Sequence, residues 1–320
     1  MQRIHQYEES SVQEKILSLL PLEKIEKEAN ENLKKQEIEL ELEQAKAKEQ
    51  DGLQKLPQKE KNITLSYRDF LVKSLLYWFK YNFFTWCNQP KCQNCDIIAE
   101  KYIRQDSPSF EESKFLASRT EVYQCPNCQK EIRFPRYNDP RKLCETKTGR
   151  CGEWANLFGA ILRAFNFDVR FVDNFEDHVW NEYYSEHLKK WVHVDSCENA
   201  FDTPLVYEQG WGREMTVVLG HSIHGVQDCT ARYVKDFEFV KKKRSPDTIN
   251  NLKSHIEKIN KEKRFILTEN ERNYLANRDK EENEFFMKID FIKKVINKEE
   301  LIERQSGSDA WRKERGEMKN

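Results

Sequence analysis

The stretch Gly149-Arg150-Cys151-Gly152-Glu153-Trp154-Ala155-Asn156-Leu157-Phe158 determines how the middle of this chain folds. After Cys151, apolar residues recur at three- and four-residue spacing as far as Phe165, which predicts an amphipathic helix that begins near Gly152. Cys151 then lies at a helix N-terminus, where unpaired backbone N–H groups and the helix dipole favour a thiolate. Most free cysteines are small packing residues, so this segment alone leaves a nucleophile and a core residue both open.

A predicted β-hairpin follows the helix and carries polar side chains suited to catalysis. Its two strands are Asp177–Tyr184 and Trp191–Asp195, joined by a short polar loop. With the turn centred in that loop, Asp195 falls opposite or diagonal to His178, and cross-strand neighbours of this kind can touch. A base held by a carboxylate, with a thiol from elsewhere, is the arrangement of an activated nucleophile. His193 is a rival base, and structural roles for both histidines stay open.

Two cysteine pairs predict a structural metal site. Cys92-x-x-Cys95 and Cys125-x-x-Cys128 are separated by the 29 residues 96–124, long enough for strands near Ile97–Ile103 and Thr120–Gln124. Tetrahedral zinc takes four thiolates, and a two-residue spacer lets one tight turn present two of them. We predict one structural zinc with these four ligands; disulfides or independent thiols are the alternatives.

Composition narrows the function classes. The formal net charge is -1, which gives no electrostatic support for nucleic acid or an anionic membrane as a partner. No apolar stretch approaches the roughly 18 residues that a membrane span requires. Nine cysteines, an odd number, fit metal binding and catalysis better than a disulfide framework, which predicts a reducing, cytoplasmic compartment.

Charged residues make up 34% of the chain and concentrate at its two ends. We therefore expect a charged helical N-terminal extension (residues 1–60), a catalytic core (61–240) that contains the metal-binding segment 86–135, and a helical C-terminal extension (241–320) that packs back on the core. A long surface helix is predicted over residues 11–50, interrupted or started at Pro21. The run Gln50–Lys61 reads as a linker. The predicted class is α+β.

Several strings resemble one family of enzymes. GRCGEWANLF, DHVWNEYY and WVHVDSCENAFDTPLVYEQGWG are similar to segments of the cytoplasmic peptide:N-glycanases, which belong to the transglutaminase-like cysteine hydrolases. FFTWCNQPKCQNC, CPNC and RFPRYNDPRKL resemble that family's zinc-bearing segment, and RQSGSDAWRKERGE resembles the end of its catalytic region. The resemblance implies a transglutaminase-like, papain-like core with an inserted zinc-binding subdomain and flanking charged helices.

The resemblance also implies roles for individual residues. Cys151 matches the nucleophile, His178 the base and Asp195 the residue that orients it, while Cys92, Cys95, Cys125 and Cys128 match the zinc ligands. Five further residues are expected to contact substrate: Arg150, Trp154, Trp180, Trp191 and Glu198. The segment Leu219–Gly225 matches the family only loosely, so its role is left open.

The implied activity is hydrolysis of the amide bond that joins an N-glycan to Asn in misfolded or denatured glycoproteins, through a thioester, in endoplasmic-reticulum-associated degradation. Implied partners are those glycoproteins and, through the N-terminal helix, a ubiquitin-receptor shuttle protein that leads to the proteasome. The cytoplasm, with the nucleus as a second compartment, is the expected location. A transglutaminase-like protease or acyl transferase, and an inactive transglutaminase-fold binding module, are the alternative functions.

Overall fold

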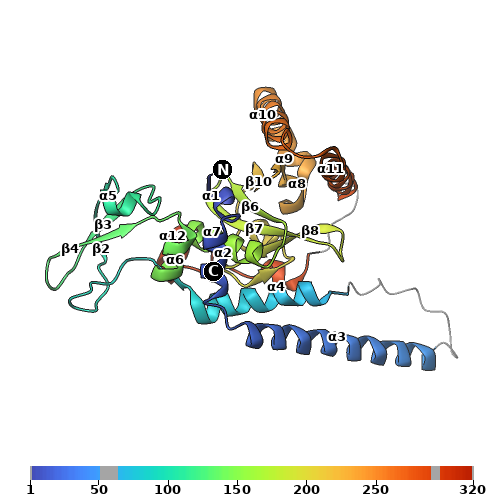
Figure 1. The fold of residues 1–320 in the computed structure, drawn as a ribbon, viewed down its shortest axis with the longest axis horizontal. Coiled ribbons are helices and arrows are strands. Elements are labelled where there is room, and N and C mark those ends of the chain that lie inside the picture. The colour runs from blue at the N-terminus through green and yellow to red at the C-terminus, as the bar shows by residue number, and fades with distance from the viewer. Residues whose placement is uncertain (1, 51–63, 290–295, 319–320) are drawn as a thin grey trace.

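A six-stranded antiparallel sheet forms the centre of the molecule (Figure 1). The computed structural model describes residues 2–50, 64–289 and 296–318. The strand order is β11-β10-β6-β7-β8-β9, with each neighbouring pair antiparallel. The strands are β6 (Val169–Asn174), β7 (His178–Ser185), β8 (Lys190–Asp195), β9 (Ala200–Phe201), β10 (Val218–Ser222) and β11 (Gly225–Asp228). The predicted hairpin is confirmed, because β7 pairs with β8.

Alternation along the strands creates one hydrophobic cluster on each face of this sheet. On β6, Phe171 joins the cluster that contains helix α7 (Cys151–Ala164), whereas its neighbour Val172 joins the opposite cluster with Trp180. Helix α7 buries almost its whole length, Glu153 to Leu162, against β6 and β7. The predicted helix is therefore present, and it begins at Cys151 itself.

The N-terminal segment is more deeply buried than the sequence suggested. Helices α1 (Gln2–Gln6) and α2 (Ser10–Leu17) pack on α7, and the Tyr7 hydroxyl donates a hydrogen bond to Asn156 Oδ1 over 3.0 Å. The expected break at Pro21 is observed, but Val12 and Ile16 on the near side of it belong to the core. Only α3 (Leu22–Gln50), which packs on α4 (Tyr67–Trp78), has the predicted character of a surface helix (Figure 1). Residues 51–61 of the predicted linker lie outside the described residues.

The segment that carries the cysteine pairs extends from one side of the core (Figure 1). It is a three-stranded antiparallel sheet of β2 (Lys101–Asp106), β3 (Thr120–Gln124) and β4 (Glu131–Pro135), with the short helix α5 (Phe110–Ser113). Ile132–Pro140 reads as a proline-punctuated connection, yet its first half is β4, because its backbone pairs with β3. The parallel pair β1 (Thr85–Trp86) and β5 (Thr148–Gly149) joins this segment to the core, and helix α6 (Pro140–Thr146) follows β4.

The C-terminal third packs back along the edge of the central sheet. Leu219–Gly225, whose role the sequence left open, forms most of the hairpin β10–β11. Helix α10 (Pro246–Arg264) packs against this hairpin through Ile259. The other elements are the π-helical turns η1 (Phe79–Phe83) and η2 (Val206–Gly210), helices α8 (Thr230–Tyr233), α9 (Phe237–Lys243), α11 (Glu269–Ile289) and α12 (Asp309–Glu314), and the 3-10 turn η3 (Lys298–Leu301).

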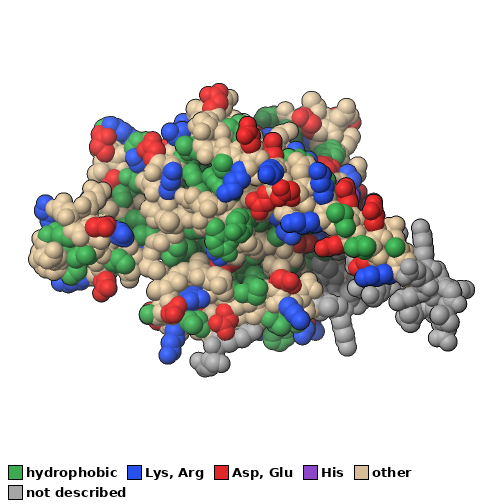
Figure 2. Space-filling model, turned by 90° about the horizontal axis from the view of Figure 1, so that it is seen from below, with side chains coloured by type: hydrophobic (Ala, Val, Ile, Leu, Met, Phe, Trp, Pro, Cys, Tyr) green, Lys and Arg blue, Asp and Glu red, His purple; other side chains and the backbone are tan. Residues whose placement is uncertain are grey.

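Acidic and basic side chains are intermixed over the face of the molecule seen in Figure 2, without a large area of one sign. This distribution agrees with the near-neutral formal charge of -1. Within the described ranges, no helix combines the length and the apolar character that a membrane crossing demands.

Candidate active site

The start of α7 is fixed by a network around Cys151. The Glu153 carboxylate accepts a hydrogen bond from the Arg150 backbone N–H (2.9 Å) and a bidentate pair from Arg136 (2.7 and 2.8 Å). A Cβ on Gly149 would come within 2.4 Å of the Glu153 Cβ, so glycine permits this close approach. Cys151 is the first residue of the helix and is partly buried, so its thiol is held at the helix N-terminus.

The hairpin brings His178 and Asp195 together. In the register of β7 and β8, Val194 pairs with Asn181, which makes Asp195 the diagonal neighbour of His178. The distance between His178 Nε2 and Asp195 Oδ2 is 2.8 Å, and both side chains are buried. The other ring nitrogen, Nδ1, has no hydrogen-bond partner among the described residues. This geometry leaves Nδ1 available to the thiol while Nε2 is held by the carboxylate.

The charges in this cluster favour a thiolate–imidazolium pair. Burial alone would raise the pKa of Cys151, but its contact with His178 and the positive charge of Arg304 outweigh burial, so the pKa lies below the ordinary 9.0. Burial lowers the pKa of His178, yet the Asp195 charge and hydrogen bond raise it to about 9. Asp195 itself has a pKa of about 2, because the histidine charge overcomes the effect of its burial. Proton transfer from Cys151 to His178 is therefore favoured near neutral pH.

His193, the rival base, is committed to another role. Its Nδ1 accepts a hydrogen bond from the Thr203 backbone N–H (3.3 Å), which assigns the proton to Nε2, 2.7 Å from the Tyr207 hydroxyl. That hydroxyl donates to Asp195 Oδ2 over 3.0 Å. Burial lowers the pKa of His193 to about 4, so it is neutral at pH 7. His193 and Tyr207 thus hold the carboxylate that orients His178.

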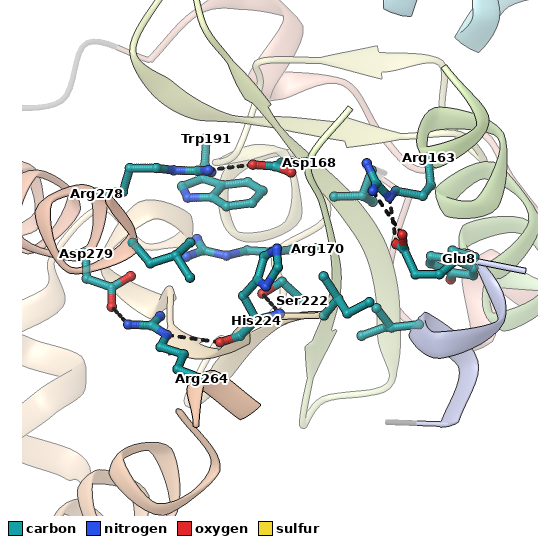
Figure 3. A pocket seen from close by; sticks show the side chains of 15 residues that line it. Glu8, Arg163, Asp168, Arg170, Trp191, Ser222, His224, Arg264, Arg278 and Asp279 are labelled. Carbon is teal, nitrogen blue, oxygen red and sulfur yellow. Dashed lines mark hydrogen bonds and ion pairs between the residues drawn. The ribbon is translucent and has the colours of Figure 1, made fainter. Parts of the chain in front are cut away.

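Two of the tryptophans expected to contact substrate are packed elsewhere. Trp180 is 1% exposed and lies behind His178, stacked on Tyr207 at 4.2 Å between ring centroids. It shares the strand face of His178 as the alternation predicts, but core residues cover that face. Trp191 lies between two guanidinium groups, with Arg170 at 3.9 Å and Arg278 at 4.9 Å from its ring centroid (Figure 3). Trp180 is therefore enclosed in the core, whereas Trp191 lines a separate pocket together with Arg170 and Arg278 (Figure 3).

Arg150 and Glu198 are likewise engaged within the protein. The Arg150 guanidinium bonds Glu121 (2.8 Å) on β3 and the carbonyl oxygens of Cys87 (3.0 Å) and Asn88 (3.0 Å). It therefore connects the three-stranded sheet to the start of α7. Glu198 accepts two backbone hydrogen bonds from the segment at 305–306 (2.6 and 3.1 Å). The substrate contacts that we expected for both residues stay a prediction.

A surface cavity does reach the start of α7, and one predicted residue borders it. Trp154 is 3% exposed and packs edge-on against Phe79 and Phe84, but its rim lines this cavity. The other lining residues include Trp86 from β1, Cys197 after β8, and the C-terminal segment Gln305–Gly307. Three distant parts of the sequence therefore meet beside Trp154, three residues after Cys151.

Sequence reasoning missed the residues that surround the triad from a distance. The positive charge of Arg304 acts on Cys151, and the Tyr207 hydroxyl donates a hydrogen bond to Asp195. Trp211 packs on His178 with ring centroids 4.9 Å apart. Arg304 opens the string RQSGSDAWRKERGE, whose resemblance to the end of the family's catalytic region was the one indication of a role. Local periodicity contains no information on such long-range contacts.

The four cysteines of the two pairs converge as a metal site requires. Their sulfur atoms lie within 4.8 Å of one another, and the Sγ atoms of Cys92 and Cys128 are 3.6 Å apart. Sulfur atoms around tetrahedral zinc, at about 2.3 Å from the metal, are separated by about 3.8 Å, so this donor set fits zinc. Each pair sits in a turn completed by a residue of positive φ, Asp96 (53°) and Gln129 (60°). The arrangement leaves no position open for substrate, as in structural sites.

Comparisons with known proteins place the fold and the family. Residues 98–196 match the transglutaminase-like superfamily. A chain in the crystal structure of Rad4-Rad23 crosslinked to an undamaged DNA superposes with a TM-score of 0.52 at 15% identity, over 92% of this chain and 56% of that one. At that identity the likeness shows the fold alone. The family match agrees with the transglutaminase-like class expected from the sequence, and the mixture of helices and strands agrees with the predicted α+β class.

Curated relatives share far more of the sequence. The peptide-N(4)-(N-acetyl-beta-glucosaminyl)asparagine amidase of Saccharomyces cerevisiae is 42% identical over 265 residues, which cover 78% of this chain and 71% of that protein. The Homo sapiens protein of the same name is 38% identical over 99% of this chain, which spans 45% of its length. The Yarrowia lipolytica protein is 43% identical, and the match covers 78% of this chain and 69% of that relative. The chain therefore belongs to the family of peptide-N(4)-(N-acetyl-beta-glucosaminyl)asparagine amidases.

Proposed function

We propose that this chain removes N-glycans from denatured glycoproteins by hydrolysing the amide bond between the glycan and Asn. The observation that carries the proposal is the order of three side chains: Asp195 bonds His178, and His178 interacts with Cys151 at the start of α7. The chain also belongs to a family named for this reaction. The product is a protein with Asp in place of the glycosylated Asn, together with the released glycosylamine.

The proposed reaction has two steps. The Cys151 thiolate attacks the side-chain carbonyl carbon, the C–N bond breaks, and His178 gives its proton to the departing glycosylamine nitrogen. His178 then takes a proton from water, which adds to the thioester and restores the thiolate. The first-turn N–H groups of α7 lack intrahelical acceptors and are the proposed donors to the developing oxyanion. Asp195 keeps the imidazole oriented in both steps.

A heat-denatured N-glycoprotein provides the direct test. We expect free glycan and an Asn-to-Asp mass change at the former sequon, detected by peptide mass spectrometry, and slower release from the native glycoprotein. A cleaved backbone would instead indicate a protease, and a crosslinked peptide an acyl transferase. No chemical change at all, with retained binding of the glycopeptide, would indicate a binding module.

The activity should depend on pH in a way set by the Cys151–His178 pair. The reactive form requires an anionic thiol and a cationic imidazole. Because the pKa of Cys151 lies below 9.0 and that of His178 is about 9, this form is present near neutral pH and is lost as pH rises through about 9. We therefore expect kcat/KM to fall on the alkaline side near pH 9. A profile that keeps rising beyond pH 9, as for an ordinary thiol, would contradict the ion pair.

We propose that the four cysteines bind one structural zinc and that segment 86–135 is a zinc-binding subdomain inserted in the core. Support comes from the sulfur geometry. The metal would complete a segment with a very small core, whose hydrophobic cluster consists of Cys87, Ala99, Tyr123 and Phe134. It would take no part in bond breaking.

We propose that α3 docks the ubiquitin-receptor shuttle protein, in the cytoplasm or nucleus. Ile38 and Leu42 lie one turn apart on α3 and are 56% and 54% exposed, although both are apolar. Apolar residues at such spacing are suited to a partner helix. Deleting residues 1–60 would remove Tyr7 and Val12 from the core, so point substitutions are the better test. A fluorescent fusion confined to another compartment would contradict the location.

Ile38→Glu with Leu42→Glu is expected to weaken binding of the shuttle protein at least about tenfold, because two charges would replace the apolar contact. Isothermal titration with the purified shuttle protein measures the change. Phe110→Glu on α5 is the matched control, since Phe110 is 79% exposed and lies on the cysteine-bearing segment. Unchanged affinity in the α3 variant would exclude this helix as the docking site.

A further inference from the structure

Arg304 is a charged side chain buried beside the proposed active site without contributing to the triad. It follows η3 and is 1% exposed, and its Nη1 bonds both carboxylate oxygens of Glu317 at 3.2 and 3.0 Å. Its Nε donates to Ser306 Oγ over 3.0 Å. Burial of a guanidinium is unfavourable unless it is paired, and Glu317 provides the partner that keeps Arg304 charged here.

Three indole rings surround this guanidinium and connect it to the triad. The Arg304 Cζ lies 4.5 Å from the Trp311 ring centroid, 4.7 Å from that of Trp211 and 5.6 Å from that of Trp86. Trp211 in turn contacts the His178 ring at 4.9 Å, and Trp86 lies 6.5 Å from Trp154 on α7. One aromatic ring therefore separates the charge from His178, and the low polarity of these rings strengthens its field.

The backbone around Arg304 is fixed to the same site. Gln305 and Ser306 donate their N–H groups to Glu198, three residues after Asp195, and the Ser308 N–H donates to Asn88 Oδ1 over 3.2 Å. Arg312 also bonds the Arg304 carbonyl oxygen. Residues 305–307 form one wall of the cavity that reaches Trp154. The C-terminal segment thus closes the site from a sequence distance of more than one hundred residues.

Arg304 is not the only cation that is bonded to Glu317. Glu317 is shared with Arg213 (2.6 Å) and Arg315 (3.2 Å), so three cations use one carboxylate. The positive charge of Arg304 acts on Cys151 and His178 in the same direction, because it lowers the pKa of each. The other groups that act on the pair are Glu153 from α7, Asp195 and His193 from β8, and Cys197 after β8. Tyr207 from η2 bonds Asp195, and Glu198 acts on Arg304.

We propose that Arg304 is a positioning residue of the active site: its guanidinium, held by Glu317 among three tryptophans, keeps Cys151 anionic and lets His178 release its proton to the leaving group. The inference rests on the proposed nucleophile, Cys151. It assigns a chemical role to the C-terminal segment, which would otherwise be explained by packing alone.

The test is the pH dependence of Cys151 alkylation by iodoacetamide, followed by peptide mass spectrometry, which needs no glycoprotein. In Arg304→Gln we expect the midpoint to rise, so that alkylation below neutral pH slows roughly three- to tenfold, the effect of about half to one pH unit. The alkaline limb of kcat/KM should move upward as well. Arg304→Lys, which keeps the charge, should restore most of the wild-type midpoint.

The direction of the two shifts separates electrostatics from structural damage. Loss of a nearby cation raises both pKa values, whereas loosening of the Cys151–His178 contact raises the first and lowers the second. Glu317→Gln, which keeps the guanidinium, should move both downward and decides the case if Arg304→Gln does not fold. Arg278→Gln is the control, because Arg278 is also buried and stacked on rings, at the other end of β8. Unchanged alkylation midpoints in folded Arg304→Gln, or shifts of the two pKa values opposite to those expected for either variant, would overturn the proposal. If the midpoints shift as expected but the wild-type protein releases no glycan, only the proposed substrate is overturned.

Discussion

Cys151→Ala is expected to reduce glycan release from a denatured glycoprotein by roughly 10⁶-fold, the scale on which removal of a catalytic nucleophile acts in hydrolases. The reason is that no other thiol is placed to substitute for it. Cys197, the neighbouring thiol, is buried, and burial together with the Asp195 charge raises its pKa well above 9.0. The fold should be retained, because Cys151 is only partly buried and alanine suits the first turn of a helix. Glycan release measured by chromatography, beside thermal unfolding, gives both quantities.

Cys144→Ala is the matched control for this experiment. Cys144 is 3% exposed on α6, and burial raises the pKa of its thiol to about 12, so it is a packing residue. We expect full activity with a loss of stability of about 1 kcal/mol. If Cys151→Ala kept wild-type activity, or if Cys144→Ala lost it as completely at unchanged stability, the assignment of the nucleophile would be wrong.

The parts of the fold predicted from the sequence are those set by local pattern. Helix α7 follows from the spacing of Trp154, Leu157 and Phe158, and the β7–β8 pair follows from alternation around a polar turn. The diagonal placement of Asp195 and His178 was also predicted correctly. What alternation could not distinguish is whether such a face meets substrate or core. Trp180 shows this, because it shares the face of His178 but is covered by Tyr207 and Tyr233.

The parts that were not predicted depend on contacts between distant segments. Strand β4 contains Arg133 and ends at Pro135, and it is a strand because β3 offers its free edge. In β10, Gly220 and His221 have low strand propensity, yet pairing with Val172 and Phe171 of β6 overrides it. Arg304 is the extreme case. Nothing near it in sequence shows that its charge lies beside a thiol more than one hundred residues earlier.

Removal of the metal is expected to affect the active site although no cysteine of the metal site contacts substrate in the proposed reaction. Glu121 on β3 connects the two sites, because its carboxylate accepts hydrogen bonds from Arg150 (2.8 Å) and Arg136 (3.0 Å). Arg150 precedes Cys151, and Arg136 also bonds Glu153. If β3 loosens, both arginines lose an anion. A metal that fixes β3 would therefore also hold the residues that fix the first turn of α7.

We expect Cys125→Ser to abolish zinc binding and to unfold segment 86–135, because binding of structural zinc contributes on the order of 10 kcal/mol to folding in small zinc domains. Native mass spectrometry should show one zinc in the wild type and none in the variant. Hydrogen exchange should become fast in β2, β3 and β4 while the β7–β8 hairpin stays protected, and glycan release should fall with it. Cys144→Ala should retain the zinc. A metal-free Cys125→Ser protein with protected β3 amides and full activity would show that neither the site nor its link to Cys151 exists.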